Sequence, residues 1–234
     1  QCLGMSSADV LGDKGLKEFG KETGVDLSFT GAEHIADDGF TLLKSNNPIM
    51  RGFDLARNTL LGIKHAYNVM ELDIPFYEFE HLYNEYERFK LFNGLRDFTD
   101  MMVELANRPN NLPVLNTIFL DEAQDLTPLQ WKVAHALGER CQRMFVAGDD
   151  DQAIYRWAGA DINHFVSLAG GSEVLSQSYR IPRSVHRVAE SVVQRIQYRQ
   201  KKIWYPRHEE GSVERTYDAS TVSFGNEEWL VLAQ

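Results

Sequence analysis

Acidic residues follow two short apolar runs of this sequence, at the points where a strand would end. Asp121 and Glu122 come directly after the run 117–120. A second acidic group, Asp149–Asp151, closely follows the run 143–147. Short apolar, partly β-branched runs are typical of strands buried on both faces of a parallel sheet. Because ligands bind beyond the carboxyl ends of the strands in open α/β sheets, we expect both acidic groups to line one polar site.

The residues between these two runs predict a helix. Thr127 and Pro128 form a helix start, with proline at the first helical position, and we expect the helix to end near Gly138. A strand, a helix and a second strand in this order form a βαβ unit, whose strands are parallel. The sequence therefore predicts an α/β fold that brings the two acidic groups to the same edge of a sheet.

These residue types suit phosphate chemistry with a divalent cation. An acid after a buried strand can hold Mg²⁺ directly or through water, so Asp121 and Glu122 are the candidate metal ligands. Glu122 is also the candidate general base, because it can accept the proton of an attacking water. Gln152 can hydrogen-bond that water or a γ-phosphate oxygen. The alternative is that Asp and Gly gather here because they tolerate turns, but two acidic turns on successive strands favour a site.

Three sequence blocks also carry a family resemblance. LDEAQD, AGDDDQAIYRWAGAD and LSQSYRIP, in that order, resemble motifs II, III and IV of the UvrD/Rep-type superfamily 1 DNA helicases. The resemblance is firm over residues 91–207. It implies a P-loop NTPase fold with two RecA-like motor domains, and hydrolysis of ATP with Mg²⁺. It also implies 3′-to-5′ movement on single-stranded DNA, with single strands or a duplex junction as partners.

The resemblance assigns a nucleotide site. It implies that Asp121 and Gln152 contribute to binding of ATP and Mg²⁺, that Arg180 contacts the γ-phosphate as a catalytic residue, and that Tyr179 stacks on the adenine. A cation placed where phosphoryl charge develops is an arginine-finger arrangement. Ser178 departs from the family pattern, which more commonly has Asn at this position.

The resemblance also assigns a DNA site. Tyr155 and Trp157 are expected to stack on bases, whereas an isolated Tyr-x-Trp is most often a packing element. Ala158 stands where these helicases usually have Arg, which puts the usual polar coupling between the metal-site Glu and the DNA site in doubt. We do not expect Arg156 to substitute, because it points elsewhere on a regular backbone.

The phosphate-binding loop of such a motor is absent from this sequence. Residues 15–22 nearly spell the Walker A pattern, but Glu22 stands where a Ser or Thr hydroxyl is needed. We interpret this segment as a short helix with Leu16 and Phe19 facing inward. Because the chain also begins at Gln1 rather than Met, we expect it to be a piece of a longer protein.

The fold is therefore expected to be a RecA-like parallel sheet with a helical insert, incomplete at both ends. Residues 1–30 are the expected start of the first motor domain, and 31–93 the helical insert, in which an aromatic stripe over 76–89 is core. Residues 94–200 return to the motor domain, with a helix capped by Asp161 and a further strand at 173–176. A helix that extends to Ile196 is expected after Pro182. Residues 201–234 open the second motor domain, ending in a buried strand.

Composition places the chain among ordinary soluble domains of the reducing cytoplasm. Cys2 and Cys141 have no metal-type spacing, and neither a membrane helix nor a signal peptide is evident. The net charge is −10, which argues against general coating of nucleic acid. The segment 180–207 nevertheless carries eight basic residues against one acid, which is compatible with local phosphate contacts or with a solvated helix face.

Two other functions stay open at this stage. A metal-dependent nuclease would use Asp121, Glu122 and Asp149–Asp151 and would cleave without ATP. A regulatory or DNA-binding module would retain the motor fold without the phosphate loop. If the chain is part of a helicase, we expect it to be inactive alone as an ATPase and helicase. The Walker A region and the later motifs V and VI must then come from the rest of the helicase chain.

Overall fold

The computed structural model describes residues 2–25, 47–168, 171–218 and 221–222. The chain divides into two compact units, residues 1–168 and 169–234, and each is described by itself. Among the described residues, no helix has the length and apolar character needed to traverse a lipid bilayer.

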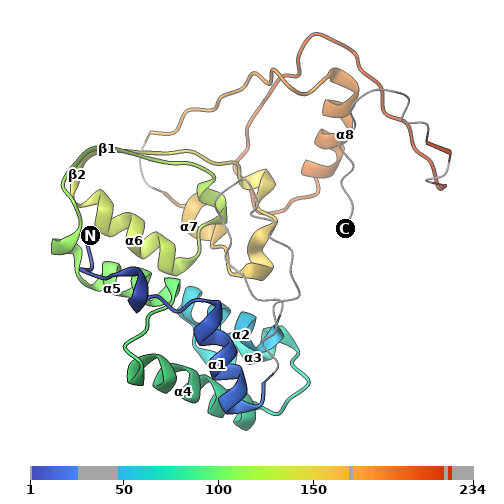
Figure 1. Ribbon diagram of the computed structural model, residues 1–234. Coiled ribbons are helices and arrows are strands. Elements are labelled where there is room, and N and C mark those ends of the chain that lie inside the picture. Colours follow the sequence, from blue (N-terminus) through green and yellow to red (C-terminus); the bar gives the residue numbers. More distant parts are fainter. Residues whose placement is uncertain (1, 26–46, 169–170, 219–220, 223–234) are drawn as a thin grey trace. The chain divides into compact units, whose positions relative to one another are not determined.

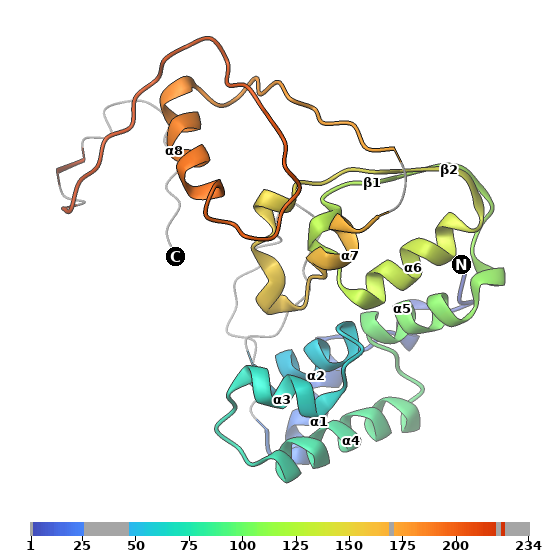
Figure 2. The ribbon, with the colours of Figure 1, turned by 180° about the vertical axis from the view of Figure 1, so that it is seen from behind.

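Four helices of the first unit lie together (Figures 1 and 2) and enclose an aromatic core. They are α1 (Asp13–Thr23), α2 (Pro48–Asn58), α3 (Ile63–Met70) and α4 (Phe76–Phe92). Phe19, Phe53 and Phe79 are almost completely buried in this core. The structure thus confirms the helix predicted over the aromatic stripe and the interpretation of residues 15–22 as helix. The part of the predicted helical insert before residue 47 lies almost wholly outside the described residues.

The βαβ unit is present as predicted. Strand β1 (Leu115–Leu120) pairs in parallel with β2 (Cys141–Val146), so that Leu120 lies opposite Val146. Between them, α6 (Pro128–Gly138) begins in a capping box in which the Thr127 hydroxyl accepts the Gln130 amide hydrogen. The α/β class with a small parallel sheet is therefore confirmed.

The prediction that both strands are buried on both faces is wrong for the described residues. Leu120 and Val146 pack against a buried hydrophobic cluster that includes Trp131 of α6. On the other face Phe119 and Phe145 are 75% and 51% exposed and stack on each other at 5.2 Å between ring centroids. The described sheet has only these two strands, so one of its faces lies open.

Short elements complete the first unit. Helix α5 (Phe98–Asn107) follows α4, and α7 (Ile162–Val166) begins at Asp161, whose side chain accepts the His164 amide hydrogen as predicted. The remaining turns are 3-10 helices at Ser7–Asp9, Pro109–Asn111, Ala123–Asp125, Asp150–Gln152 and Tyr155–Ala158.

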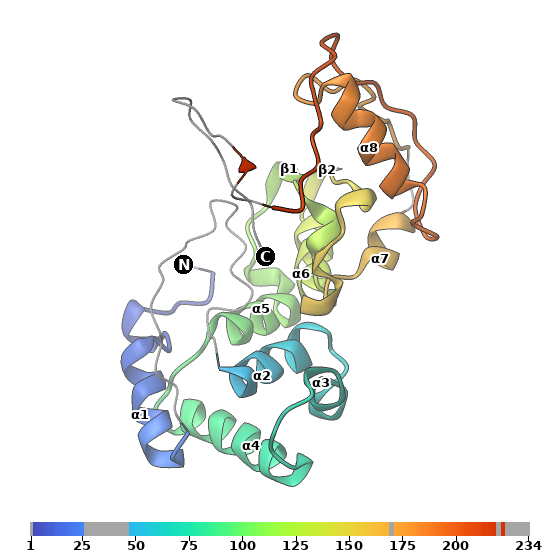
Figure 3. The same ribbon diagram turned by 90° about the vertical axis from the view of Figure 1, so that its right-hand side faces the viewer.

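The second unit contains one helix among its described residues, α8 (Arg183–Val193), with Pro182 as its N-cap (Figure 3). The helix start after Pro182 is thus confirmed, although Ile196 lies beyond the helix end. The strand predicted at 173–176 is wrong: the described chain there forms only an isolated bridge between Gln177 and Tyr205. The strand predicted near the end of the chain lies outside the described residues.

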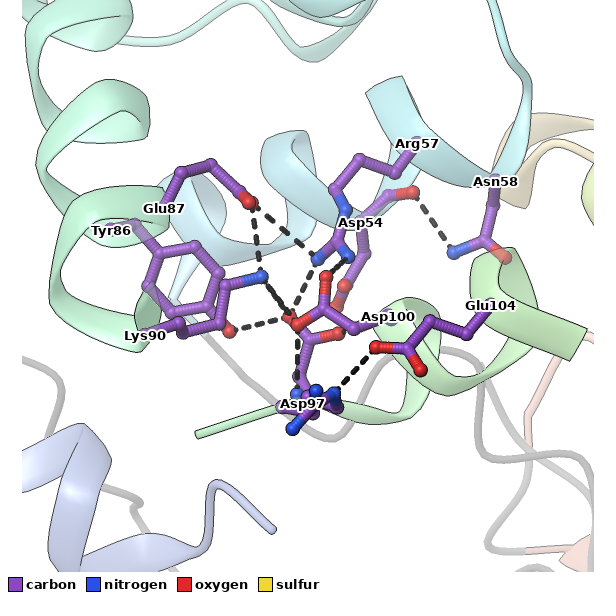
Figure 4. A network of polar contacts seen from close by, with 10 residues as sticks. Asp54, Arg57, Asn58, Tyr86, Glu87, Lys90, Asp97, Asp100 and Glu104 are labelled. Atoms are coloured by element: carbon purple, nitrogen blue, oxygen red, sulfur yellow. Dashed lines mark hydrogen bonds and ion pairs between the residues drawn. The ribbon is translucent and has the colours of Figure 1, made fainter. Parts of the chain in front are cut away.

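A buried network of charges joins α2, α4 and α5 (Figure 4). The Lys90 ammonium pairs with Asp97 at 2.9 Å and with Asp100 at 2.8 Å, and Arg57 pairs with the same two carboxylates. The side chain of Lys90 is only 3% exposed. Burial alone would raise the pKa of Asp97, but Arg57 and Lys90 lower it well below its usual range, so Asp97 stays charged. Ion pairs therefore join α2 and α4, which precede the expected domain boundary near residue 93, to α5, which follows it.

Asp54 is the acid in this network whose charged form burial disfavours. Burial raises the pKa of Asp54 to about 7, and the neighbouring Asp97 carboxylate adds to the rise against the opposing effects of Arg57, Lys90 and a hydrogen bond with Thr99. The folded pKa lies above the ordinary value of 3.8. Protonation of Asp54 therefore stabilises the fold at low pH, and this contribution is lost as pH rises toward about 7.

We predict that Asp54→Asn stabilises the chain above pH 7 and leaves its stability near pH 4 almost unchanged. Asparagine keeps the neutral form that the buried site favours, so at pH 8 the gain should be on the order of a few kcal/mol. Urea unfolding at several pH values measures it. Asp73→Asn, at an exposed acid, is the matched control and should be neutral throughout. Equal stability of the wild type and Asp54→Asn at pH 8 would contradict the prediction.

Candidate functional site

The tip of β1 presents the two predicted acids to solvent. Asp121 and Glu122 are both exposed, and the Glu122 amide donates a hydrogen bond to Asp121 Oδ1 at 3.0 Å. Glu122 lies in the left-handed region at φ 50° and ψ 40°, which is uncommon for a residue other than Gly, Asn or Asp. Such strain costs about 1–3 kcal/mol and persists where the surrounding structure enforces it, often at functional sites.

Gln124 joins this tip to the tip of β2. Its side chain is 2% exposed. The amide Nε2 donates to Glu122 Oε2 at 2.9 Å, while Oε1 accepts the backbone N–H of Asp149 at 2.9 Å. The backbone continues the link, because the Ala123 amide donates to the Ala147 carbonyl at 2.9 Å. The two acidic groups that the sequence predicts at one sheet edge are thus brought together.

Sequence reasoning missed Gln124 as a site residue. In the segment 121–125, Gln124 stands out only as an uncharged polar residue among acids. This pattern does not by itself distinguish a buried bridging residue from an exposed turn residue. The distinction depends on Asp149, a residue distant in sequence. Only the pairing of the two strands supplies this partner.

The second tip is an acidic turn that hydrogen-bonds to itself. The Asp149 carboxylate accepts the Asp151 amide hydrogen at 3.1 Å and the Gln152 side-chain amide at 2.6 Å. Carboxylate oxygens of Asp149, Asp150 and Asp151 lie within 4.8 Å of one another. Gln152, predicted to position water, is exposed and stands next to this turn.

The predicted base-stacking residues lie on the loop that follows. Tyr155 and Trp157 are 39% and 58% exposed, and their ring centroids are 6.4 Å apart. Ala158 is buried, and the next residue, Gly159, has φ 96°. A Cβ at Gly159 would lie 2.8 Å from Thr59 Cγ2, so glycine permits the loop to pack closely on the end of α2. The aromatic rings therefore project from an anchored loop rather than forming part of the core.

Tyr179 and Arg180 belong to the second unit, and their predicted roles stay predictions. Both side chains are exposed, Tyr179 by 83%. Their segment is held by the Ser178 amide, which donates to the Tyr205 carbonyl at 2.8 Å, and by the Ser178 hydroxyl, which accepts the Ile181 amide hydrogen at 3.2 Å. This arrangement leaves the tyrosine ring and the guanidinium directed to the surface of their own unit.

The donors at the β1 tip fit a hard divalent cation. Mg²⁺ prefers oxygen ligands and is commonly held by one or two carboxylates together with water and substrate phosphates. Asp121 and Glu122 offer exposed carboxylates on adjacent residues. A phosphate-binding loop is not among the described residues, since residues 15–22 are helical. The donor set at the β1 tip therefore suits a hard divalent cation.

We predict that Gln124→Ala destabilises the first unit by about 1–3 kcal/mol, because it leaves the half-buried Asp149 amide without its acceptor. Gln152→Ala is the matched control: it removes the same amide group from an exposed position and should change stability by less than about 0.5 kcal/mol. Urea unfolding of the three proteins measures both effects. Equal losses for the two variants would mean that Gln124 does not bridge the strand tips.

Comparison with known proteins agrees with the resemblance in the motifs. The family described as UvrD/REP helicase N-terminal domain matches residues 56–170. The ATP-dependent DNA helicase PcrA of Bacillus subtilis is 28% identical over 162 residues, which cover 64% of this chain and 22% of that protein. A probable DNA helicase II homolog of Mycoplasma genitalium is 25% identical over 209 residues, 80% of this chain and 29% of that protein.

PcrA of Staphylococcus aureus (strain Mu50) is 27% identical over 153 residues, 60% of this chain and 21% of that protein. The chain thus spans between a fifth and a third of the length of these relatives. The matched region contains both strand tips, Gln124 and the aromatic loop. The family match over residues 56–170 and the named relatives together support a UvrD/Rep-type helicase fragment.

Proposed function

We propose that this chain is part of an ATP-dependent DNA helicase or translocase that couples ATP hydrolysis to 3′-to-5′ movement on single-stranded DNA. The observation that supports this most strongly is the joined pair of strand tips. Gln124 holds Glu122 on one tip and the Asp149 turn on the other, beside exposed aromatic residues. The names of the relatives, ATP-dependent DNA helicases, agree with such a motor.

In this proposal the polar residues of the two tips hold the metal ion and activate the attacking water. Asp121 and Glu122 hold Mg²⁺, which supplies charge neutralisation at the phosphates of ATP. Glu122 takes the proton of the attacking water, and its carboxylate is kept in place by the Gln124 amide. Gln152 orients the water or a γ-phosphate oxygen. Arg180 neutralises charge at the γ-phosphate, and Tyr179 stacks on the adenine.

The remaining parts of the motor are proposed partners. A phosphate loop supplies the backbone N–H groups and the lysine that cradle β- and γ-phosphates. A second motor domain supplies further contacts to ATP and DNA. Without these parts we expect the 234-residue chain neither to hydrolyse ATP nor to unwind DNA. We place the complete protein in the cytoplasm, where its free cysteines stay reduced.

A metal-dependent nuclease is a second candidate because three carboxylates of Asp149–Asp151 lie within 4.8 Å of one another. The contacts of Asp149 speak against it, since its carboxylate already holds the Gln152 amide and the Asp151 backbone. These bonds suit a turn that positions Gln152. Cleavage of DNA with Mg²⁺ and without ATP would favour the nuclease over the motor.

We predict that Trp157→Ala in the complete motor weakens single-strand binding by about 1–3 kcal/mol, the range for a lost base-stacking contact. Basal ATP hydrolysis should be retained, while its stimulation by DNA falls. DNA titration at fixed salt, with thermal melting alongside, measures this. A structural tryptophan gives a different result, because truncation of a buried one costs about 3–5 kcal/mol of stability and lowers all activities together. A stable variant with unchanged DNA affinity would remove Trp157 from the site.

A further inference from the structure

Arg51 of α2 lies against the exposed ring of Trp157. Its guanidinium carbon is 5.9 Å from the centroid of the indole, within the range of a cation–π contact. The two residues are far apart in sequence and come from different elements, so no sequence motif joins them. The contact places a positive charge at the edge of the aromatic loop.

This charge differs from the two buried cations of the same helix bundle, Arg57 and Lys90. Arg57, on the same helix, is neutralised by Asp97 and Asp100, and Lys90 by the same acids. Within the described part of the chain, no carboxylate forms an ion pair with Arg51. A half-buried guanidinium that an aromatic ring holds, and that no described carboxylate neutralises, is suited to an anionic ligand.

One support carries both side chains. Gly159, directly after the aromatic turn, packs against Leu55 and Thr59 at the end of α2, and Arg51 stands earlier on the same helix. The backbone that carries the indole is therefore packed against the helix that carries the guanidinium. A nucleotide offers matching chemistry: a flat base that stacks on an aromatic face, and a phosphate a few ångströms away that a guanidinium can bind.

We propose that Arg51 is a phosphate-binding residue of the nucleic-acid site and contacts the backbone of the strand whose base stacks on Trp157. This inference rests on the proposed function and deepens it, since it adds a cation from α2 to a site otherwise built from the aromatic loop. With a net charge of −10 the chain as a whole repels a polyanion, so contacts to phosphate depend on local cations such as Arg51.

The salt dependence of binding tests the proposal. A labelled oligodeoxythymidine is titrated with the 234-residue chain at a series of salt concentrations, and the slope of log affinity against log salt is measured. Each phosphate contact on a single strand contributes about −0.7 to this slope. Arg51→Gln should weaken binding and make the slope less steep by about 0.7, whereas Arg51→Lys should retain the wild-type slope.

Arg88→Gln is the matched control, because it removes the same charge from a 71% exposed side chain that pairs with Glu85 on α4. It should leave affinity and slope unchanged. Thermal melting of each variant checks that the fold is retained. Trp157→Ala should weaken binding without changing the slope, because it removes stacking rather than charge.

The outcomes distinguish the inference about Arg51 from the proposed DNA site. If Arg51→Gln keeps the wild-type slope while Trp157→Ala weakens binding, Arg51 only supports the indole and the inference fails, but the DNA site stands. If neither variant changes binding, both the inference and the proposed DNA site fail. Absence of measurable binding by the wild-type chain at low salt would also overturn both.

Discussion

The hydrogen bonds that join the Gln124 side chain to Glu122 and to Asp149 are the interaction on which the candidate site depends. Parallel strands stop sharing ladder hydrogen bonds at their tips, so the loops beyond them need other partners. Gln124 supplies these partners from a nearly solvent-free position, donating to Glu122 and accepting from Asp149. An amide can do both at once, which a carboxylate or an aliphatic side chain cannot. The strained backbone of Glu122 is thereby held in one conformation.

The buried ion pairs among α2, α4 and α5 are a second constraint on the structure. Removing one member of such a network leaves its partner charged and desolvated, which typically costs about 3–5 kcal/mol. The network therefore fixes how α2 lies against its neighbours. Since α2 also carries Arg51 and supports the turn before Gly159, the position of the aromatic loop depends on these ion pairs as well. Within the network, burial raises the pKa of Asp54 to about 7.

Local signals explain what the sequence could predict. The helix start at Thr127–Pro128, the cap at Asp161 and the parallel strands around α6 follow from residues adjacent in the chain, and all are present. Features that depend on distant partners were not predicted. Gln124 became a site residue only through Asp149, and Arg51 only through Trp157. The residues 173–176 have a strand-like composition but, within the described chain, no neighbouring strand to pair with.

ATP turnover in the complete motor tests the central claim most directly, namely that the joined strand tips form the catalytic half of a nucleotide site. Glu122→Gln preserves the size and shape of the side chain, but the glutamine amide cannot act as a base. We expect it to bind ATP normally while turnover with single-stranded DNA and Mg²⁺ falls by a factor of about 10²–10⁴, the usual contribution of a general base. Near-normal hydrolysis by this variant would contradict the account.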